Sequence, residues 1–223
     1  ERFKEKIFTQ KKEIVSDKLI WFHGASIGEI NSIIPIIKYF LKKNDELKII
    51  ITSVTLSSSK IFENEFKKEK NIIHKYFPVD VPHLINNFIK EYEPSLVIFV
   101  DSEIWPNCIS EIKRKKIPIV LLNARITNKT LGRWLWFKNF AKKMFSSFDI
   151  CIASSLNSKE NLEILGANNI SYYGNLKYIN SSKKLEKLEK LTTDSLKNRI
   201  VWIASSTHKG EEDFCFKTHK LLK

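Results

Sequence analysis

The alternation of short β-branched runs with helix-like segments is the feature that most limits how this chain can fold. Seven runs are typical of strands, at 18–22, 47–52, 73–77, 95–100, 117–122, 149–153 and 170–173. The segments between them have the apolar spacing of amphipathic helices, at 29–43, 57–68, 81–92, 105–116, 132–145 and 158–165. Strands separated by helices in this way form βαβ units, whose strands are parallel. The sequence therefore predicts an α/β fold built on a doubly wound, Rossmann-like parallel sheet.

The composition changes after the seventh run. Residues 180–198 are rich in Lys, Ser and Leu without a strand-like run, which indicates a linker with a solvated helix. A further run at 200–204 precedes a polar turn at 205–210 and a helix that begins at Glu211. We expect a first domain over 1–178, and a linker with the incomplete start of a second Rossmann-like domain over 179–223. The chain does not begin with Met, so we expect a piece of a longer protein.

The basic residues are unevenly distributed. The formal net charge is +13, but only five of the 38 basic residues are Arg, whose forked side chain usually reads bases and grips phosphates. The segment 112–148 has no acidic residue, and its basic and aromatic residues are Lys113, Arg114, Lys115, Lys116, Arg125, Lys129, Arg133, Lys138, Lys142, Lys143, Trp134, Trp136, Phe137, Phe140, Phe145 and Phe148. It is either a solvated basic helix over a core stripe or a surface for anionic lipid, whose interface accommodates Trp and Phe.

The sequence lacks the motifs that indicate several common kinds of site. No Gly-x-Gly-x-x-Gly follows the first run and no P-loop occurs, which disfavours ordinary dinucleotide and nucleoside triphosphate sites. Three scattered cysteines without a Cys-x-x-Cys pair suggest neither a disulfide framework nor a zinc site, and no His, Asp and Glu have metal-ligand spacing. Neither a signal peptide nor a membrane-spanning apolar run is visible, and a reducing, cytosolic setting fits best.

Polar side chains follow six of the seven strand-like runs, at 23–29, 52–55, 101–103, 123–125, 154–155 and 174–177. The carboxyl ends of parallel strands share one edge of the sheet, where α/β proteins place their sites. These clusters therefore converge on one crevice. We predict that this crevice holds two or three carboxylates, an Arg and a Lys.

Two interpretations compete at residues 23–29. Two glycines allow a sharp turn there. Ser26 and Glu29 have the spacing of a capping box, in which the Glu29 carboxylate bonds a backbone N–H. A general base instead needs a carboxylate within reach of a substrate hydroxyl, and a bond to a backbone N–H makes it a poorer base. We favour an arrangement in which Ser26 caps the helix and leaves Glu29 free.

The other clusters also have plain structural interpretations. Asp101 and Glu103 either lie in the first turn of a helix, where the dipole favours acids, or orient a catalytic group. Lys177 is either a surface lysine or a cation for a phosphate or carboxylate. Residues 206–208 either cap a helix or offer hydroxyl and N–H groups to an anion.

Five motifs occur in an order that resembles the 3-deoxy-D-manno-octulosonic acid (Kdo) transferase family of lipopolysaccharide synthesis. They are WFHGASIGE at 21–29, DSEIWPN at 101–107, NAR at 123–125, GNLK at 174–177 and ASSTHKGEE at 204–212. The resemblance implies two facing Rossmann-like domains, the GT-B architecture, with the lipid A precursor on the N-terminal domain and CMP-Kdo on the C-terminal one. It also implies a place on the cytoplasmic face of the inner membrane, with an anchor upstream of residue 1.

The implied activity is that of an inverting, metal-independent glycosyltransferase without a cofactor, which moves Kdo from CMP-Kdo to the 6-hydroxyl of lipid IVA. By resemblance, Glu29 is the proton acceptor, and Asp101 and Lys177 stabilise the transition state. We expect the acceptor to bind at His23, Ser26, Gly28, Thr52, Thr55, Glu103, Asn123 and Arg125. We expect the donor at Ser206, Thr207 and His208.

The sequence departs from the family at three positions. Asp101 stands where Glu is usual, which shortens the side chain by one methylene. Ser154 stands where Gln is common, and Asn180 stands where an Asp commonly follows the GNLK motif. Most of the donor-binding half is missing, so we expect this piece alone to be inactive. The alternatives are another GT-B nucleotide-sugar transferase or epimerase, and a basic module that binds membranes or nucleic acid.

Overall fold

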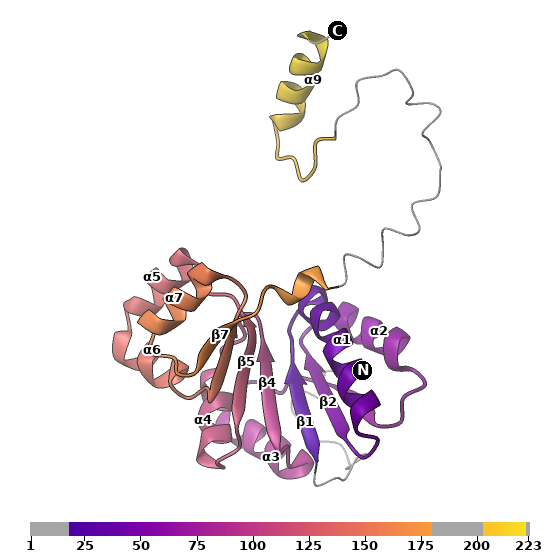
Figure 1. Ribbon diagram of the computed structural model, residues 1–223, viewed down its shortest axis with the longest axis vertical. Helices are drawn as coiled ribbons and strands as arrows, with labels where there is room; N and C mark the ends of the chain where they lie inside the picture. Colours follow the sequence, from indigo (N-terminus) through magenta and orange to yellow (C-terminus); the bar gives the residue numbers. More distant parts are fainter. Residues whose placement is uncertain (1–17, 180–202, 222–223) are drawn as a thin grey trace. The chain divides into compact units, whose positions relative to one another are not determined.

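A computed structural model describes residues 18–179, which belong to one compact unit, and residues 203–221, which belong to a second (Figure 1). The strands of the first unit are β1 (Leu19–His23), β2 (Lys48–Ser53), β3 (Ile72–Tyr76), β4 (Leu96–Val100), β5 (Ile119–Ala124), β6 (Ile150–Ala153) and β7 (Ile170–Tyr172). Its helices are α1 (Ile27–Lys43), α2 (Leu56–Phe66), α3 (Pro82–Tyr92), α4 (Pro106–Arg114), α5 (Asn128–Leu135), α6 (Lys138–Phe145), α7 (Leu156–Ile164) and the 3-10 helix η2 (Leu176–Tyr178).

These strands form one parallel sheet in the order β3-β2-β1-β4-β5-β6-β7. The chain moves outward from β1 to β3, returns to place β4 beside β1, and then moves outward in the other direction (Figure 1). Sheets of this kind bind ligands where the direction reverses, which here is between β1 and β4. The predicted α/β fold with a doubly wound parallel sheet is confirmed.

Each face of the sheet buries its own apolar core, because successive residues of a strand point to opposite faces. Trp21 lies in the core built with α3, α4, α6 and α7, whereas Phe22 lies in the core built with α1 and α2. Both side chains are fully buried, and burial of a side chain of this kind contributes about 1.5–3 kcal/mol. Packing on both faces therefore fixes the end of β1, from which the candidate site begins.

The single helix predicted at 132–145 is wrong, because the chain forms two helices, α5 and α6, that meet at Trp136 and Phe137. The ring centroids of Trp134 and Phe145 lie 5.2 Å apart in an edge-on contact. In one straight helix these residues would be about 16 Å apart along the axis. The break lets both aromatic side chains reach the same core.

Of the two interpretations of Asp101 and Glu103, a place in the first turn of a helix is wrong. Helix α4 begins at Pro106, and Trp105 before it is extended, because proline disfavours a helical conformation in the preceding residue. The N-terminus of α4 is instead bonded by Asp80, which accepts from the backbone N–H of Asn107 at 3.1 Å and of Cys108 at 2.7 Å. Asp101 and Glu103 therefore lie in a turn ahead of the helix.

In the second unit, α9 (Glu211–Leu221) begins at the predicted residue. Ile203 and Ala204, the end of the strand predicted at 200–204, are irregular, and the rest of that strand lies outside the described residues. The linker predicted at 180–198 also lies outside them, so the predicted domain division stays a prediction. Over 18–179 and 203–221, none of the helices has the length and apolar character needed to cross a bilayer.

Candidate active site

The ends of β1, β4 and β5, which are neighbours in the sheet, carry most of the residues predicted for the site. His23 ends β1, and Glu29 lies in the first turn of the helix that follows. The turn after β4 contains Asp101 and Glu103. Asn123 lies near the end of β5 and contacts the segment that carries Lys177. The predicted convergence of carboxylates and a lysine is thus found at the switch point of the sheet.

The Glu29 carboxylate is held by the turn that precedes its own helix. Its Oε2 accepts the backbone N–H of Ala25 at 2.6 Å and that of Ser26 at 3.4 Å, and its Oε1 accepts the Ser26 hydroxyl at 2.8 Å. The Ser26 hydroxyl in turn accepts the Glu29 N–H, which completes a capping box. The expectation that Ser26 alone caps the helix and leaves Glu29 free is therefore wrong.

Gly24 makes this close arrangement possible. A Cβ at this position would lie 3.1 Å from the Glu29 Cβ and 3.3 Å from the Ile30 Cδ1, which is tighter than ordinary contact. A Cβ on Gly28 would meet only the Ser26 hydroxyl oxygen, at 3.9 Å. Of the two glycines in the turn, only Gly24 is needed for space.

The capping bonds do not lower the pKa of Glu29 overall. Burial raises its pKa above the ordinary value, and the hydrogen bond from Ser26 opposes this rise. The negative charge of Glu103 raises the pKa further, and the bonds from Ala25 and Ser26 N–H lower it. The net direction is upward, because burial disfavours the charged form of a carboxylate.

Glu103 is fixed between two ring nitrogens. Its Oε2 accepts the Trp105 Nε1–H at 2.8 Å and lies 3.4 Å from His23 Nε2. His23 is fully buried, and its other nitrogen, Nδ1, lies 2.9 Å from the Thr52 hydroxyl. The contact to Glu103 is within ion-pair range but is not aligned as a hydrogen bond, so His23 Nε2 has no hydrogen-bond partner in the described part of the chain.

Asp101 and Lys177 form an ion pair. Lys177 Nζ donates to Asp101 Oδ2 at 2.6 Å, with side-chain exposures of 40% for the lysine and 6% for the aspartate. Asp101 adopts a left-handed backbone conformation, with φ of 63°, which Asp and Asn tolerate better than most residues. The shorter side chain, compared with the Glu usual in the resembling family, still makes this contact.

The end of β5 holds the segment that carries Lys177. Asn123 is left-handed, with φ of 54°, and its Oδ1 accepts the Leu176 N–H at 3.1 Å. Asn175 caps η2 through a bond from the Lys177 N–H at 3.0 Å. The Asn123 Nδ2 is buried and has no hydrogen-bond partner among the described residues.

The remaining predicted acceptor residues have different places. Thr52 is fully buried beneath the site, where its hydroxyl accepts the Trp21 Nε1–H at 2.8 Å. Thr55 is the N-cap of α2, and Gly28 is the second residue of α1. Arg125 is exposed, and its backbone N–H donates to the Asp101 carbonyl at 3.2 Å. The hydroxyls of Thr52 and Thr55 thus bond the protein itself, at the carboxyl edge of the sheet and at the start of α2.

Sequence reasoning missed the part that Trp105 has in the site. A Trp two residues after Glu103 could have drawn attention, because a partly buried indole N–H needs an acceptor. It also missed Ser58 of α2, whose hydroxyl donates to the Ala25 carbonyl at 3.4 Å and ties α2 to the Glu29 turn. No pattern in the sequence indicated that contact.

The residues predicted for the donor lie in the second unit, in the turn before α9. The Thr207 hydroxyl donates to Glu212 Oε1 at 2.6 Å, and the His208 N–H donates to Glu211 Oε2 at 2.8 Å. Ser206 is left-handed, with φ of 58°. Two carboxylates of the first turn of α9 thus accept the hydrogen bonds of Thr207 and His208. The bond from Thr207 lowers the pKa of Glu212.

The segment 112–148 exposes aromatic side chains where α5 meets α6. Trp136 is 86% exposed and Phe137 is 70% exposed, whereas Phe145 and Phe148 are buried in the core. We call the exposed large apolar side chains and the basic residues around them the α5–α6 corner: Leu135, Trp136, Phe137, Phe140, Lys129, Arg133, Lys138, Lys142 and Lys143.

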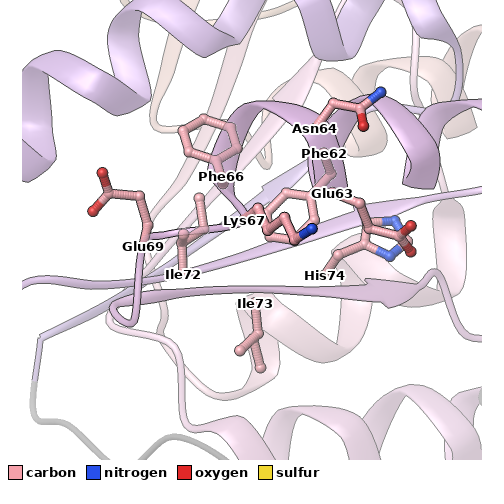
Figure 2. Close-up of a pocket in the computed structure, with 9 residues that line it drawn as sticks. All are labelled: Phe62, Glu63, Asn64, Phe66, Lys67, Glu69, Ile72, Ile73 and His74. Atoms are coloured by element: carbon pink, nitrogen blue, oxygen red, sulfur yellow. The ribbon is translucent and has the colours of Figure 1, made fainter.

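The pocket shown in Figure 2 lies apart from the residues predicted for this site. In the two described ranges, no three His, Cys, Asp or Glu side chains come together in a way that could hold a metal ion. A pocket of about 620 Å³ lies by α2 and β3 (Figure 2), lined by Phe62, Glu63, Asn64, Phe66, Lys67, Glu69, Ile72, Ile73 and His74. It contains none of the residues predicted for the site.

Comparisons with known proteins bear on this geometry. The family described as 3-deoxy-D-manno-octulosonic-acid transferase (kdotransferase) matches residues 1–180. The 3-deoxy-D-manno-octulosonic acid transferase of Rickettsia bellii is 32% identical over 100% of this chain and 53% of its own length. That of Haemophilus influenzae is 31% identical over 91% of this chain and 48% of its own length. The chain spans about half the length of the curated relatives it matches.

Solved structures show a likeness of fold. The UDP-GlcNAc 2-epimerase from Neisseria meningitidis bound to UDP-GlcNAc has a TM-score of 0.54 and 16% identity, and the match covers 80% of this chain and 51% of that one. The UDP-N-acetylglucosamine 2-epimerase from Rickettsia bellii has a TM-score of 0.51 and the same identity, over 80% and 50%. At this level of identity the likeness shows the fold alone.

Proposed function

Because the chain belongs to the Kdo transferase family, we propose that the whole protein transfers Kdo from CMP-Kdo to the 6-hydroxyl of lipid IVA, a lipid A precursor, in lipopolysaccharide synthesis. In this proposal the sheet edge of the first unit binds the acceptor. The donor binds to a second domain, of which residues 206–208 are the beginning. The observation that carries the proposal is the pair of carboxylates, Glu29 and Glu103, beside the Asp101–Lys177 ion pair at the switch point.

Glu29 is the proposed proton acceptor. Its Oε1 accepts one hydrogen bond from the described residues, that of Ser26, so a lone pair is left for a substrate hydroxyl. The acceptor oxygen attacks the anomeric carbon of Kdo as its proton passes to Glu29. The bond from that carbon to the phosphate oxygen breaks, and CMP leaves with the electron pair. Attack on the face opposite the leaving group inverts the anomeric configuration.

Lys177 is the proposed cation for the negative charge that develops on the leaving phosphate. A fixed ammonium group can stabilise this charge without a metal ion. Asp101, which is largely buried and only 2.6 Å from Lys177 Nζ, holds the ammonium in place. We therefore propose metal-independent transfer, in which Asp101 acts on the transition state through Lys177.

Replacement of Glu29 tests this proposal in the full-length protein. We expect Glu29→Ala to lower the rate of Kdo transfer to lipid IVA by about 10²–10⁴-fold, the usual contribution of a general base, while acceptor binding is largely kept. Glu160→Gln, an exposed carboxylate of α7, is the matched control. Near wild-type transfer by Glu29→Ala would overturn the proposal. Turnover of a UDP-sugar in place of CMP-Kdo would favour the alternative of another nucleotide-sugar transferase or epimerase.

We also propose that the α5–α6 corner contacts an anionic membrane, which fits a protein on the cytoplasmic face of the inner membrane. Exposed Trp and Phe favour the interface, and the basic residues around them attract anionic headgroups. The test uses the full protein with any segment upstream of residue 1 removed, so that an anchor there does not bind the vesicles. In this protein, Trp136→Ser with Phe137→Ser should weaken binding to phosphatidylglycerol vesicles by about tenfold or more. Tyr173→Ser, at another exposed aromatic, is the control. Equal binding by both variants, or vesicle binding that salt does not weaken, would contradict the proposal.

A further inference from the structure

The chain crosses the carboxyl edge of the sheet after β7. Strand β7 is the outermost strand on one side, yet the residues that follow it run back to η2, which contacts α1 (Figure 1). We call residues 174–178 the lysine segment. Its Leu176 packs against the core built with α1 and α2, whereas its Lys177 is exposed. The place of the Lys177 ammonium therefore depends on how this segment is held above the sheet.

The ion pair with Asp101 does not hold the lysine segment by itself. The Lys177 side chain is 40% exposed, and an ion pair with an exposed partner contributes little to stability. A lysine side chain also has several rotatable bonds, which must be ordered to keep the ammonium in one place. A second attachment, through the backbone, is needed to keep Nζ 2.6 Å from Asp101 Oδ2.

The side chain of Asn123 supplies that attachment. It is 1% exposed, and its Oδ1 accepts the N–H of Leu176, the residue before Lys177, at 3.1 Å. Of the two polar atoms of the amide, only the oxygen can accept an N–H, so the bond also fixes which way the amide is turned. The left-handed backbone at Asn123, with φ of 54°, is one that Asn tolerates better than most residues.

The end of β5 holds both partners of the ion pair. The Asp101 N–H donates to the Leu122 carbonyl at 3.0 Å, and the Asp101 carbonyl accepts the Arg125 N–H at 3.2 Å. Asn123, which lies between these two residues of the chain, bonds the segment of Lys177 through its side chain. One short stretch of chain thus places the carboxylate and the ammonium against each other.

We propose that Asn123 is a positioning residue for Lys177: its amide oxygen fixes the lysine segment above the sheet edge, so that the ammonium stays where the leaving phosphate develops its charge. The inference rests on the proposed function of Lys177 as that cation. It gives Asn123 a role different from the contact to the acceptor that the sequence led us to expect. A group that stabilises charge must be in place before the reaction, because small displacements lower the rate steeply.

Steady-state transfer by the full-length protein tests this role. Asn123→Gly allows the left-handed backbone but removes the amide, and we expect kcat for Kdo transfer to fall about tenfold while KM for lipid IVA stays the same. Asn169→Gly, which should leave kcat unchanged, is the matched control. Asn169 is also left-handed, with φ of 49°, and its amide bonds the Asp149 carbonyl at the opposite edge of the sheet. A raised KM with unchanged kcat in Asn123→Gly would assign Asn123 to acceptor binding and overturn the proposal.

A conservative variant separates the two ends of the amide. Asp tolerates a left-handed backbone, and Asn123→Asp keeps an oxygen for the Leu176 N–H while it removes the Nδ2 donor. This variant should therefore lose less activity than Asn123→Gly. An equal loss in both would assign the effect to Nδ2, which has no hydrogen-bond partner in the described residues, and would contradict a role through Leu176.

Amide hydrogen exchange gives a readout that needs no turnover. The Leu176 N–H should exchange about tenfold faster or more in Asn123→Gly, and near the wild-type rate in Asn123→Asp. The Asp101 N–H, which bonds the Leu122 carbonyl, should keep its protection in both variants. Unchanged exchange at Leu176 in Asn123→Gly would show that the bond does not hold the segment. Equal loss of protection at Leu176 and Asp101 would show a general loss of structure, and it would overturn the proposal as well.

Failure of this inference can be told from failure of the proposed function. Lys177→Met removes the ammonium and should lower kcat by about 10²–10³-fold, the usual effect of losing one group that stabilises charge in the transition state. In that background Asn123→Gly should cause no further loss, because the group that it positions is gone. If Lys177→Met transfers Kdo at the wild-type rate, the proposed cation is misassigned and the inference falls with it. If Lys177→Met is impaired but Asn123→Gly lowers kcat equally in both backgrounds, only the inference about Asn123 is wrong.

Discussion

Glu29 and Glu212 stand at the starts of two helices and accept the same kind of bond, yet their proton affinities change in opposite directions. Each accepts a hydroxyl from the preceding turn, Ser26 for one at 2.8 Å and Thr207 for the other at 2.6 Å. Glu29 is half-buried beside Glu103, and its pKa is raised. Glu212 is exposed, and the bond from Thr207 lowers its pKa.

The difference shows that a capping bond does not by itself decide the direction in which the pKa of a carboxylate moves. The bond lowers the pKa in both places, but at Glu29 burial and a second carboxylate outweigh it. The sequence alone treats capping and a raised pKa as alternatives, whereas the Glu29 carboxylate makes the capping bonds and still has a raised pKa. Burial and a second charge, rather than the cap, distinguish a candidate site from an ordinary helix start.

The largest expected effect on this comparison comes from removing the space beside Glu29. In the full protein, Gly24→Ala forces a Cβ against Glu29 and Ile30, and we expect it to lower the free energy of unfolding by about 1–3 kcal/mol. Gly28→Ala, at an open position in the same turn, should be neutral or stabilise by up to about 1 kcal/mol. Urea unfolding followed by circular dichroism measures both. Equal stability of the two variants would show that the close approach at Gly24 is unimportant.

A smaller effect is expected on the pKa values of the two carboxylates, which titration followed by ¹³C NMR measures directly. Glu29 should titrate above, and Glu212 below, the ordinary glutamate pKa. The hydrogen bond from Ser26 stabilises the charged form of Glu29. Ser26→Ala removes this bond and should therefore raise the pKa of Glu29 further. A Glu29 titration below the ordinary value would remove the contrast on which the comparison depends.

Because the two pKa shifts have opposite directions, Glu29 and Glu212 change the free energy of unfolding with pH in opposite directions. The folded state holds the Glu29 proton more tightly than the unfolded state, so Glu29 costs stability above its folded pKa, and this cost disappears as the pH falls through that value. Glu212 contributes stability above the unfolded pKa, and the contribution is lost as the pH falls through its lowered folded value. Glu29→Gln should therefore make the stability of the protein less sensitive to pH just above the ordinary glutamate range.

Most of the fold could be predicted because buried strands of a parallel sheet are written in the sequence as short apolar runs. The run at 47–52 differs from β2 by one residue at each end, and the run at 95–100 differs from β4 by one residue at its start. The two-helix arrangement of α5 and α6 could not be predicted, because neither Gly nor Pro marks the break and the Trp134–Phe145 contact that favours it is tertiary. The start of α4 was within reach, since Pro106 disfavours a helix before it.

The site could be predicted as a set of residues but not as a set of contacts. The rule that strand ends share an edge brought Glu29, Asp101 and Lys177 together. The rule does not say which side chain bonds which, and Thr52 illustrates this, since its hydroxyl is used below His23 rather than at the surface. The left-handed backbones of Asp101 and Asn123, which orient the lysine segment, have no signal beyond the residue types themselves.

The order of the strands also decides when the two carboxylates meet during synthesis. The capping box of Glu29 needs only the residues of its own turn and can close as soon as α1 forms. Glu103 reaches His23 only after β4 has paired with β1, and β2 and β3 are made in between. A ribosome takes on the order of ten seconds to add the residues that separate the two acids. If α1 forms while the chain is still being made, Glu29 is at first a plain helix cap, and the second carboxylate joins it only when β4 pairs with β1.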